Sequence, residues 1–221
     1  MAKSKPKNQL DFELKLPKGY LSYSQINLYL NDPQEYHAQY ILGKDFMAEM
    51  EKNNPATAEK IKLGSIFQDA WAKPTYNWRK DLKVKGFTSD KERIIETALK
   101  QPNLARMKPS LCDKGFYVDY MGIKLIIKPD GLDTEARLLL ENKFGAPRQK
   151  EYVDQDLQLS VYALGTMLKY QFIPKIILQS VNSRNGKVNQ IETLRDESDL
   201  AHCGDLIVQA ARGISLGIWE K

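Results

Sequence analysis

The spacing of apolar residues in the first hundred positions is typical of helices. Ser22 followed three residues later by Gln25 forms a capping-box pattern, and Asp32 before Pro33 is typical of an N-cap with proline at the first helical position. Ser89 and Glu92 would form a second capping box. Helices are therefore expected over residues 22–30, 33–43, 56–73 and 89–100.

The middle of the chain changes to short β-rich runs bounded by Gly, Pro and Asp, with Met121-Gly122 and Asn185-Gly186 as turn signals. Strands are expected over residues 115–120, 123–128, 136–144, 175–182 and 188–194. Helical patterns over residues 152–170 and 197–216 complete the order. This order predicts an α/β fold, in which helices flank a central mixed sheet of about four or five strands.

Composition places the chain among globular proteins. Of its 221 residues, 42% are hydrophobic and 28% charged, which excludes an intrinsically disordered chain. No apolar run reaches the roughly 18 residues of a membrane helix, and no apolar segment follows the charged start, so we expect neither a membrane span nor a secretory signal. We expect a basic, poorly ordered arm over residues 1–20 and one domain over residues 21–221.

Charge and cysteine content narrow the possible partners only slightly. Lys and Arg number 33 against 28 Asp and Glu, giving a net charge of +5 that is compatible with a polyanionic partner but too small to demonstrate one. Cys112 and Cys203 are too few for a disulfide framework or a four-cysteine metal site. They favour reduced thiols in a cytoplasmic protein.

Two acidic residues and a lysine carry the candidate chemistry. Glu141 and Lys143 share one face of a strand, while Asn142 points to the other. Asp130 lies where the previous strand breaks, so neighbouring strands would bring Asp130 and Glu141 together. Two carboxylates suit Mg²⁺ or Mn²⁺, and a lysine beside them can orient an attacking water. A turn at Asp130 and a solvated strand face are the alternative interpretation.

Five segments, in this order, resemble the PD-(D/E)XK nuclease superfamily, most closely its RecB-type and phage recombination exonucleases. They are LSYSQI at 21–26, LGSIFQDAW at 63–71, IKPDGL at 127–132, LLENK at 139–143 and QLSVY at 158–162. The resemblance implies a restriction-endonuclease-like core, αβββαβ, over about residues 57–182. It also implies a metal-dependent DNA nuclease, an exonuclease of recombination, repair or phage DNA metabolism.

The resemblance assigns roles to five residues. Asp130 and Glu141 would bind the metal, with the Asn142 carbonyl as a third ligand. Lys143 would position the water, and Gln158 would support the site or the scissile strand.

Two departures from the family pattern matter. Gln68 stands where a metal-binding histidine is usual. Its amide oxygen can bind a hard cation, which makes Mg²⁺ the expected ion and weakens the case for Mn²⁺. This departure leaves open the alternative of an inactive nuclease-fold protein that acts as a DNA-binding or assembly factor. Asp32 replaces the first cysteine of the iron–sulfur relatives, so no iron–sulfur cluster is expected.

DNA, single- or double-stranded, is the expected partner, and a single-strand annealing or recombination protein is a candidate second partner. Residues 76–85 are predicted to form an aromatic and basic loop, suited to stacking and phosphate contacts, with a solvated loop as the alternative. The candidates for contacting DNA are Trp78, Arg79, Lys80, Arg148, Lys150 and Tyr162. No membrane partner is expected, an oligomer is left open, and the expected location is the cytoplasm, that of the host if the protein is phage-encoded.

Overall fold

The computed structural model describes residues 10–220. Its helices are α1 (Tyr23–Asn31), α2 (Pro33–Tyr36), α3 (Phe46–Asn53), α4 (Pro55–Ala72), α5 (Trp78–Val84), α6 (Ser89–Leu99), α7 (Lys150–Asp154), α8 (Leu157–Tyr170) and α9 (Glu197–Leu216). A π-helical turn, η1 (His37–Ile41), follows α2, and a 3-10 turn, η2 (Pro109–Leu111), precedes the strands. Among these described helices none is long and apolar enough to cross a membrane.

The strands form two sheets. They are β1 (Leu21–Ser22), β2 (Phe116–Tyr120), β3 (Ile123–Ile127), β4 (Gly131–Asp133), β5 (Leu138–Gly145), β6 (Lys175–Asn182) and β7 (Val188–Thr193). The smaller sheet has the order β1-β3-β2 and the larger β4-β5-β6-β7. The pairs β1–β3 and β5–β6 are parallel, and the others are antiparallel. The predicted α/β class, with a mixed sheet of four strands flanked by helices, is confirmed. Strands β1, β2 and β3 form a second sheet, which the chain leaves at Pro129.

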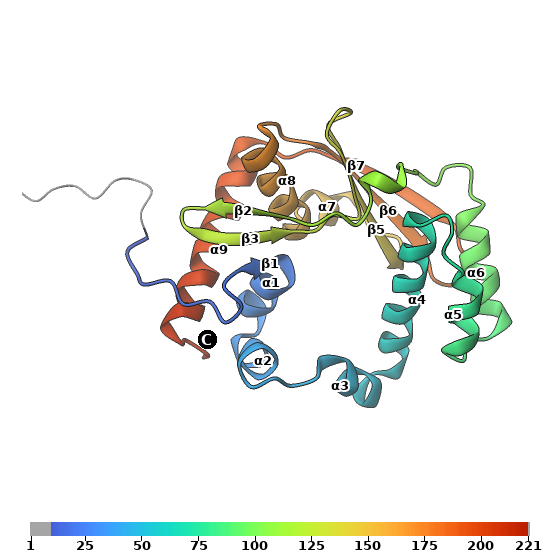
Figure 1. The fold of residues 1–221 in the computed structure, drawn as a ribbon, viewed down its shortest axis with the longest axis horizontal. Helices are drawn as coiled ribbons and strands as arrows, with labels where there is room; N and C mark the ends of the chain where they lie inside the picture. Colours follow the sequence, from blue (N-terminus) through green and yellow to red (C-terminus); the bar gives the residue numbers. More distant parts are fainter. Residues whose placement is uncertain (1–9, 221) are drawn as a thin grey trace, which may run out of the picture.

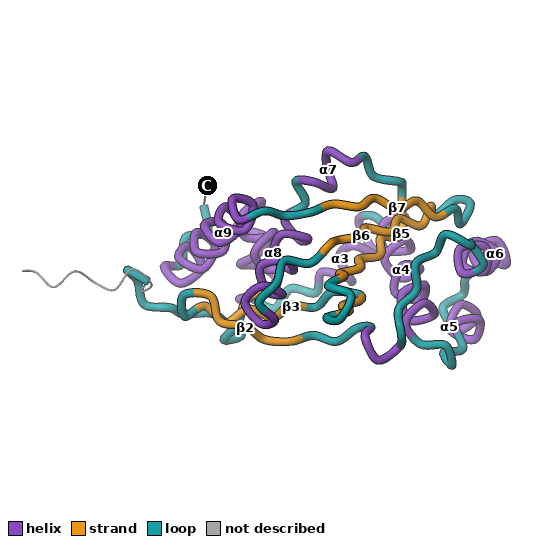
Figure 2. The backbone as a smooth tube through the Cα atoms, turned by 90° about the horizontal axis from the view of Figure 1, so that it is seen from above, coloured by secondary structure: helices purple, strands orange, loops and turns teal. Residues whose placement is uncertain are grey.

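The elements surround an opening (Figure 1). Helices α1 to α4 follow one another along its border, and the strands complete the border on the remaining side. Helices α5 and α6 lie on the outer side of α4, away from the opening, in both ribbon views (Figures 1 and 2). This arrangement leaves the inner side of α4 facing the carboxyl-terminal part of β5.

The main core joins the smaller sheet to α1, α8 and α9. Helix α8 packs on β3 through Gly165, where a Cβ atom would overlap the side chain of Ile127. Two further clusters lie around Trp71 and Leu140 and between α4, α5 and α6. Because α8 contacts the smaller sheet and also carries Gln158 toward β5, it links the two halves of the molecule.

Several predicted elements are confirmed by the structure. Ser22 caps α1 with the predicted capping box to Gln25, and Asp32 caps α2 ahead of Pro33. Strand β6 and helix α9 have the predicted bounds. The predicted helix over 152–170 is instead two helices, which separate at Gln155 and Asp156.

Other segments differ from the predictions. The prediction of a loop over residues 76–85 is wrong, because most of this stretch forms helix α5, which the side chain of Asn77 caps. Helix α6 has Thr88, not Ser89, as its N-cap, without a side-chain hydrogen bond. Helix α3 and the short strand β4 were not predicted at all.

The predicted N-terminal arm is wrong for residues 10–20. Leu10, Phe12, Leu14 and Leu16 pack against the main core, and the backbone N–H of Lys15 donates to the Ser215 hydroxyl at 2.9 Å. This segment is therefore part of the folded domain. The basic residues of the arm before position 10 lie outside the described residues.

Candidate active site

The geometry of the site starts where β4 separates from β5. The two strands pair only from Gly131 with Leu140 to Asp133 with Leu138. Beyond this pairing the Asp130 carboxylate takes the place of a strand, and Asn142 N–H donates to its Oδ2 at 2.7 Å. Because the N–H and C=O of one strand residue point to the same side, the Asn142 carbonyl also faces Asp130.

Glu141 and Lys143 project from the same face of β5, and Gln158 of α8 connects them. Lys143 Nζ donates to Glu141 Oε1 at 2.7 Å and to Gln158 Oε1 at 2.6 Å. Gln158 Nε2 donates to the same Glu141 oxygen at 2.7 Å. The glutamine therefore fixes the relative positions of the carboxylate and the ammonium group.

The negative charges of Asp130 and Glu141 are only partly balanced by positive charge close to them. Glu141 is 3% exposed, and its second oxygen, Oε2, has no hydrogen-bond partner within the described residues. Burial raises the pKa of Glu141. Burial and the charge of Glu141 raise the pKa of Asp130 to about 8. Only Lys143 compensates directly, so the site has the charge and the free oxygen that fit a divalent cation.

The donor set fits Mg²⁺ better than a softer metal. Within residues 10–220 no group of three or more His, Cys, Asp or Glu side chains could hold a metal ion. A cation beside Asp130 and Glu141 would therefore complete its shell with the Asn142 carbonyl, water or substrate oxygens. Mg²⁺ commonly binds in this way, through one or two carboxylates together with water and phosphate.

Gln68, the predicted metal ligand on α4, lies beside the site, and both ends of its side-chain amide are hydrogen-bonded to other protein groups. Its Oε1 accepts a hydrogen bond from Asn142 Nδ2 at 2.9 Å, and its Nε2 donates to Asp113 Oδ1 at 3.1 Å. On the other side of Asn142, Gln179 Nε2 donates to Asn142 Oδ1 at 2.8 Å. Gln68 therefore ties α4 to β5 and helps to hold the strand that carries Glu141.

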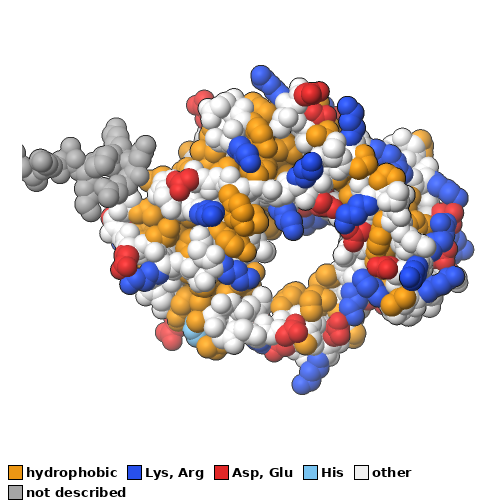
Figure 3. All heavy atoms as spheres, in the orientation of Figure 1, with side chains coloured by type: hydrophobic (Ala, Val, Ile, Leu, Met, Phe, Trp, Pro, Cys, Tyr) orange, Lys and Arg blue, Asp and Glu red, His pale blue; other side chains and the backbone are white. Residues whose placement is uncertain are grey.

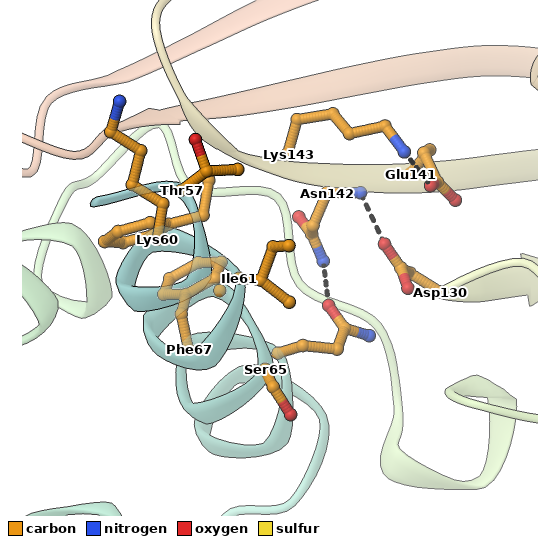
Figure 4. A pocket seen from close by; sticks show the side chains of 12 residues that line it. Thr57, Lys60, Ile61, Ser65, Phe67, Asp130, Glu141, Asn142 and Lys143 are labelled. Atoms are coloured by element: carbon orange, nitrogen blue, oxygen red, sulfur yellow. Dashed lines mark hydrogen bonds and ion pairs between the residues drawn. The ribbon is translucent and has the colours of Figure 1, made fainter. Parts of the chain in front are cut away.

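A cavity of about 540 Å³ lies between α4 and β5. Asp130, Glu141, Asn142 and Lys143 line one side, and residues of α4 line the other (Figure 4). The α4 residues include Thr57, Lys60, Ile61, Gly64, Ser65, Phe67 and Gln68. Lys60 is exposed and forms no ion pair within the described part of the chain. A substrate phosphate near the carboxylates would have this lysine as an available counter-charge.

Tyr162, a predicted DNA contact, is buried and is not placed to contact DNA. It is 7% exposed, and its hydroxyl accepts a hydrogen bond from Gln158 Nε2 at 3.0 Å. Burial, together with the charge of Glu141, raises its pKa. Tyr162 therefore supports Gln158 from behind the site.

The aromatic and basic residues of α5 are not brought to the site. Arg79 forms ion pairs with Glu92 and Glu96 of α6, and its guanidinium lies 4.2 Å from the centre of the Trp78 ring. Lys80 is exposed on the same helix. Arg79 therefore holds α5 to α6, and none of the three side chains lines the cavity that contains the carboxylates.

Arg148 and Lys150 follow β5, as the sequence suggested, but both have acidic partners. Arg148 pairs with Asp156 at 2.6 Å, and Lys150 pairs with Asp154 at 2.8 Å while donating to the carbonyl of Glu192. Arg148 also influences Tyr23 near the site, because its charge acts to lower the tyrosine pKa. Lys150 is engaged with β7 instead.

Sequence reasoning missed three residues that shape the site. Tyr23 of α1 lies close enough that burial and the charges of Asp156 and Glu141 raise its pKa to about 12. Asp156 caps α8 by accepting from Gln158 N–H at 2.8 Å. Arg195, only 4% exposed, donates to the carbonyls of Val153 and Asp156. The position of Tyr23 within LSYSQI was the only available signal.

The mixed sheets and the flanking helices form an α/β fold that fits a restriction-endonuclease-like core, with Glu141 on β5 and Asp130 just before β4. A solved structure named "putative exonuclease" from Eubacterium rectale has a similar fold, with a TM-score of 0.65 and 13% sequence identity. The match covers 92% of this chain and 84% of that one. No protein-family model matches the sequence, and no curated protein matches it.

Proposed function

We propose that this protein is a DNA nuclease of the PD-(D/E)XK type that requires Mg²⁺, or Mn²⁺ in its place, and acts as an exonuclease in DNA recombination or repair. The observation that carries the proposal is the pair of carboxylates, Glu141 buried and Asp130 half-buried, together with the Glu141 Oε2 that has no hydrogen-bond partner among the described residues. The similar fold of the solved structure named "putative exonuclease" supports the same proposal.

Asp130, Glu141 and the Asn142 carbonyl would hold the cation. When bound, such an ion polarises a phosphoryl oxygen and lowers the pKa of a bound water. Glu141 would contribute the oxygen that has no protein partner, whereas its other oxygen keeps the bonds from Lys143 and Gln158. The protein therefore leaves one carboxylate oxygen free without loosening the carboxylate.

Lys143 would orient the attacking water. A lysine ammonium has three donors, and two of them are used by Glu141 and Gln158. The third donor is left for a water or a phosphate oxygen in the cavity. The side chain of Gln158 donates to the Tyr162 hydroxyl, and its backbone N–H donates to Asp156, the N-cap of α8. These bonds fix Gln158, so the Lys143 ammonium is positioned before substrate binds.

A time course on end-labelled linear DNA, single- and double-stranded, tests the proposal. We expect degradation of at least one of these DNAs with Mg²⁺, none in excess EDTA, and loss of activity in Lys143→Ala with the thermal unfolding midpoint preserved. Lys175→Ala is the matched control, because Lys175 lies at the opposite end of the β5–β6 pair and binds Glu192 on the surface. Absence of cleavage on every DNA with either metal would refute the proposal.

A second function is favoured by one observation, the engagement of Gln68 with Asn142 and Asp113. A nuclease fold that lost its chemistry could bind DNA or assemble with other proteins. It would bind DNA in a salt-sensitive way, without metal, and Asp130→Ala would leave that binding unchanged. Metal-dependent cleavage that disappears in Asp130→Ala would exclude it.

A further inference from the structure

The opening bordered by α1 to α4 and the strands passes through the molecule when all heavy atoms are drawn (Figure 3). The candidate site faces it, because α4 lies on the border and supplies one wall of the cavity that contains Asp130 and Glu141. A chain molecule that passed through the opening would therefore run beside the carboxylates.

The border of the opening exposes apolar side chains. The segment from η1 to α3 exposes Ile41, Leu42 and Phe46, at 42%, 71% and 40%, and α4 exposes Ile61 at 41%. Hydrophobic atoms border the opening beside α3 in the space-filling view (Figure 3). A duplex presents phosphates outward, whereas an unpaired strand presents base faces that stack on aromatic and apolar side chains. The border therefore favours a single strand.

Helix α3 closes the border without a hydrophobic core. None of its eight residues is buried. Lys44, just before it, pairs with Glu35 at 3.0 Å and with Glu49 at 2.6 Å, and Lys62 of α4 pairs with Glu51 at 2.8 Å. Partly exposed ion pairs of this kind hold segments weakly, and regions with few buried contacts open locally first.

We propose that a single nucleic-acid strand enters this opening by its free end, with α3 as the strap that closes the opening around it. The inference rests on the proposed function only for what then happens at the carboxylates. It adds a substrate class, which is a strand with an accessible end. It also assigns to the ion pairs of Lys44 the role of holding the strap closed.

Cleavage of matched substrates is the first test. The same single-stranded sequence is supplied as a labelled linear strand, as a covalently closed circle, and as a linear strand with streptavidin on both biotinylated ends; a linear duplex is the fourth substrate. With Mg²⁺ we expect degradation of the free linear strand and loss of cleavage on the other three. Cleavage of the circle or of the duplex at the rate of the linear strand would overturn the inference.

A second readout does not depend on catalysis. The Lys143→Ala protein is loaded on the biotinylated linear strand, streptavidin is added afterwards, and an excess of unlabelled strand is used as a chase. We expect the threaded complex to survive the chase, and immediate displacement would overturn the inference. If the unaltered protein cuts no DNA at all, the proposed function fails, and this retention alone decides the inference.

The strap is tested with Lys44→Met, which removes both of its ion pairs. We expect this variant to gain cleavage or retention of the circular strand. Lys52→Met is the matched control, because Lys52 lies on α3 and forms no ion pair within residues 10–220. If the circular strand stays resistant to Lys44→Met, the role of the Lys44 ion pairs in closing the strap is overturned. An equal gain of cleavage or retention in Lys52→Met would overturn it as well.

Discussion

Replacing Asp130 by asparagine should stabilise the metal-free protein while removing its activity. Asparagine keeps an oxygen to accept the hydrogen bond from Asn142 N–H, but it removes one of two negative charges held close together. Burial and Glu141 raise the pKa of Asp130 from 3.8 to about 8. The native state therefore keeps a proton that the unfolded chain releases, and stability falls as the pH rises from about 4 to about 8.

The magnitude follows from the same shift. Each pKa unit corresponds to about 1.4 kcal/mol, and because Asp130 is only half-buried we take about half of the full shift, roughly 3 kcal/mol at pH 9. For a protein of this size 1 kcal/mol moves the unfolding midpoint by about 2 to 4 °C. We therefore expect Asp130→Asn to melt higher than the unaltered protein at pH 9 in EDTA, and at nearly the same temperature at pH 4.

Thermal unfolding followed by circular dichroism between pH 4 and 9 measures this difference. In Mg²⁺ we expect the order to reverse, because the ion stabilises only the protein that retains both carboxylates. Asn142→Ser, in which the backbone donor to Asp130 remains, controls for local disturbance of β5. An Asp130→Asn protein that melts lower than the unaltered one at pH 9 in EDTA would refute the reasoning that the two carboxylates repel each other.

Three further predictions concern the surroundings of the site. Gln158→Leu should abolish cleavage and cost about 1 to 3 kcal/mol of unfolding free energy, measured in urea, because Glu141 loses a buried partner. Gly165→Ala should cost about 1 to 3 kcal/mol by overlap with Ile127, and Ile127→Ala in the same chain should restore part of it; no loss in the single variant would contradict the packing. Arg79→Ala should change stability by about 1 kcal/mol or less and leave DNA degradation unchanged, whereas loss of DNA affinity would place α5 on the DNA path.

The sequence was sufficient for features with a local cause. The capping box of Ser22 and Gln25 fixes the start of α1 with two residues. The alternation in β5 places Glu141 and Lys143 on one face, and the break after β3 places Asp130 beside them. The shared face of Glu141 and Lys143 needed only strand geometry. Asp130 reaches the site through the unpredicted β4, because the predicted strands 123–128 and 136–144 lie in different sheets.

Features that depend on distant residues could not be predicted in this way. The chain forms two sheets because β3 pairs with β1 and β2 and not with β4 or β5, and the sequence does not indicate pairing partners. The hydrogen bonds of Gln68 to Asn142 and Asp113 could not be foreseen, because these partners lie far away in the chain. The break between α7 and α8 depends on Arg195, which comes about forty residues later.

The packing of residues 10–20 has a practical consequence for any shortened version of the protein. Leu10, Phe12, Leu14 and Leu16 cover part of the main core, and Asp11 pairs with Arg212 of α9. A chain that started at Leu21 would lack these side chains and expose the part of the core that they cover, and exposed apolar patches of this kind promote self-association. Dimers or larger species of such a fragment would therefore result from the deletion of residues 10–20 and would not indicate the oligomeric state of the 221-residue chain.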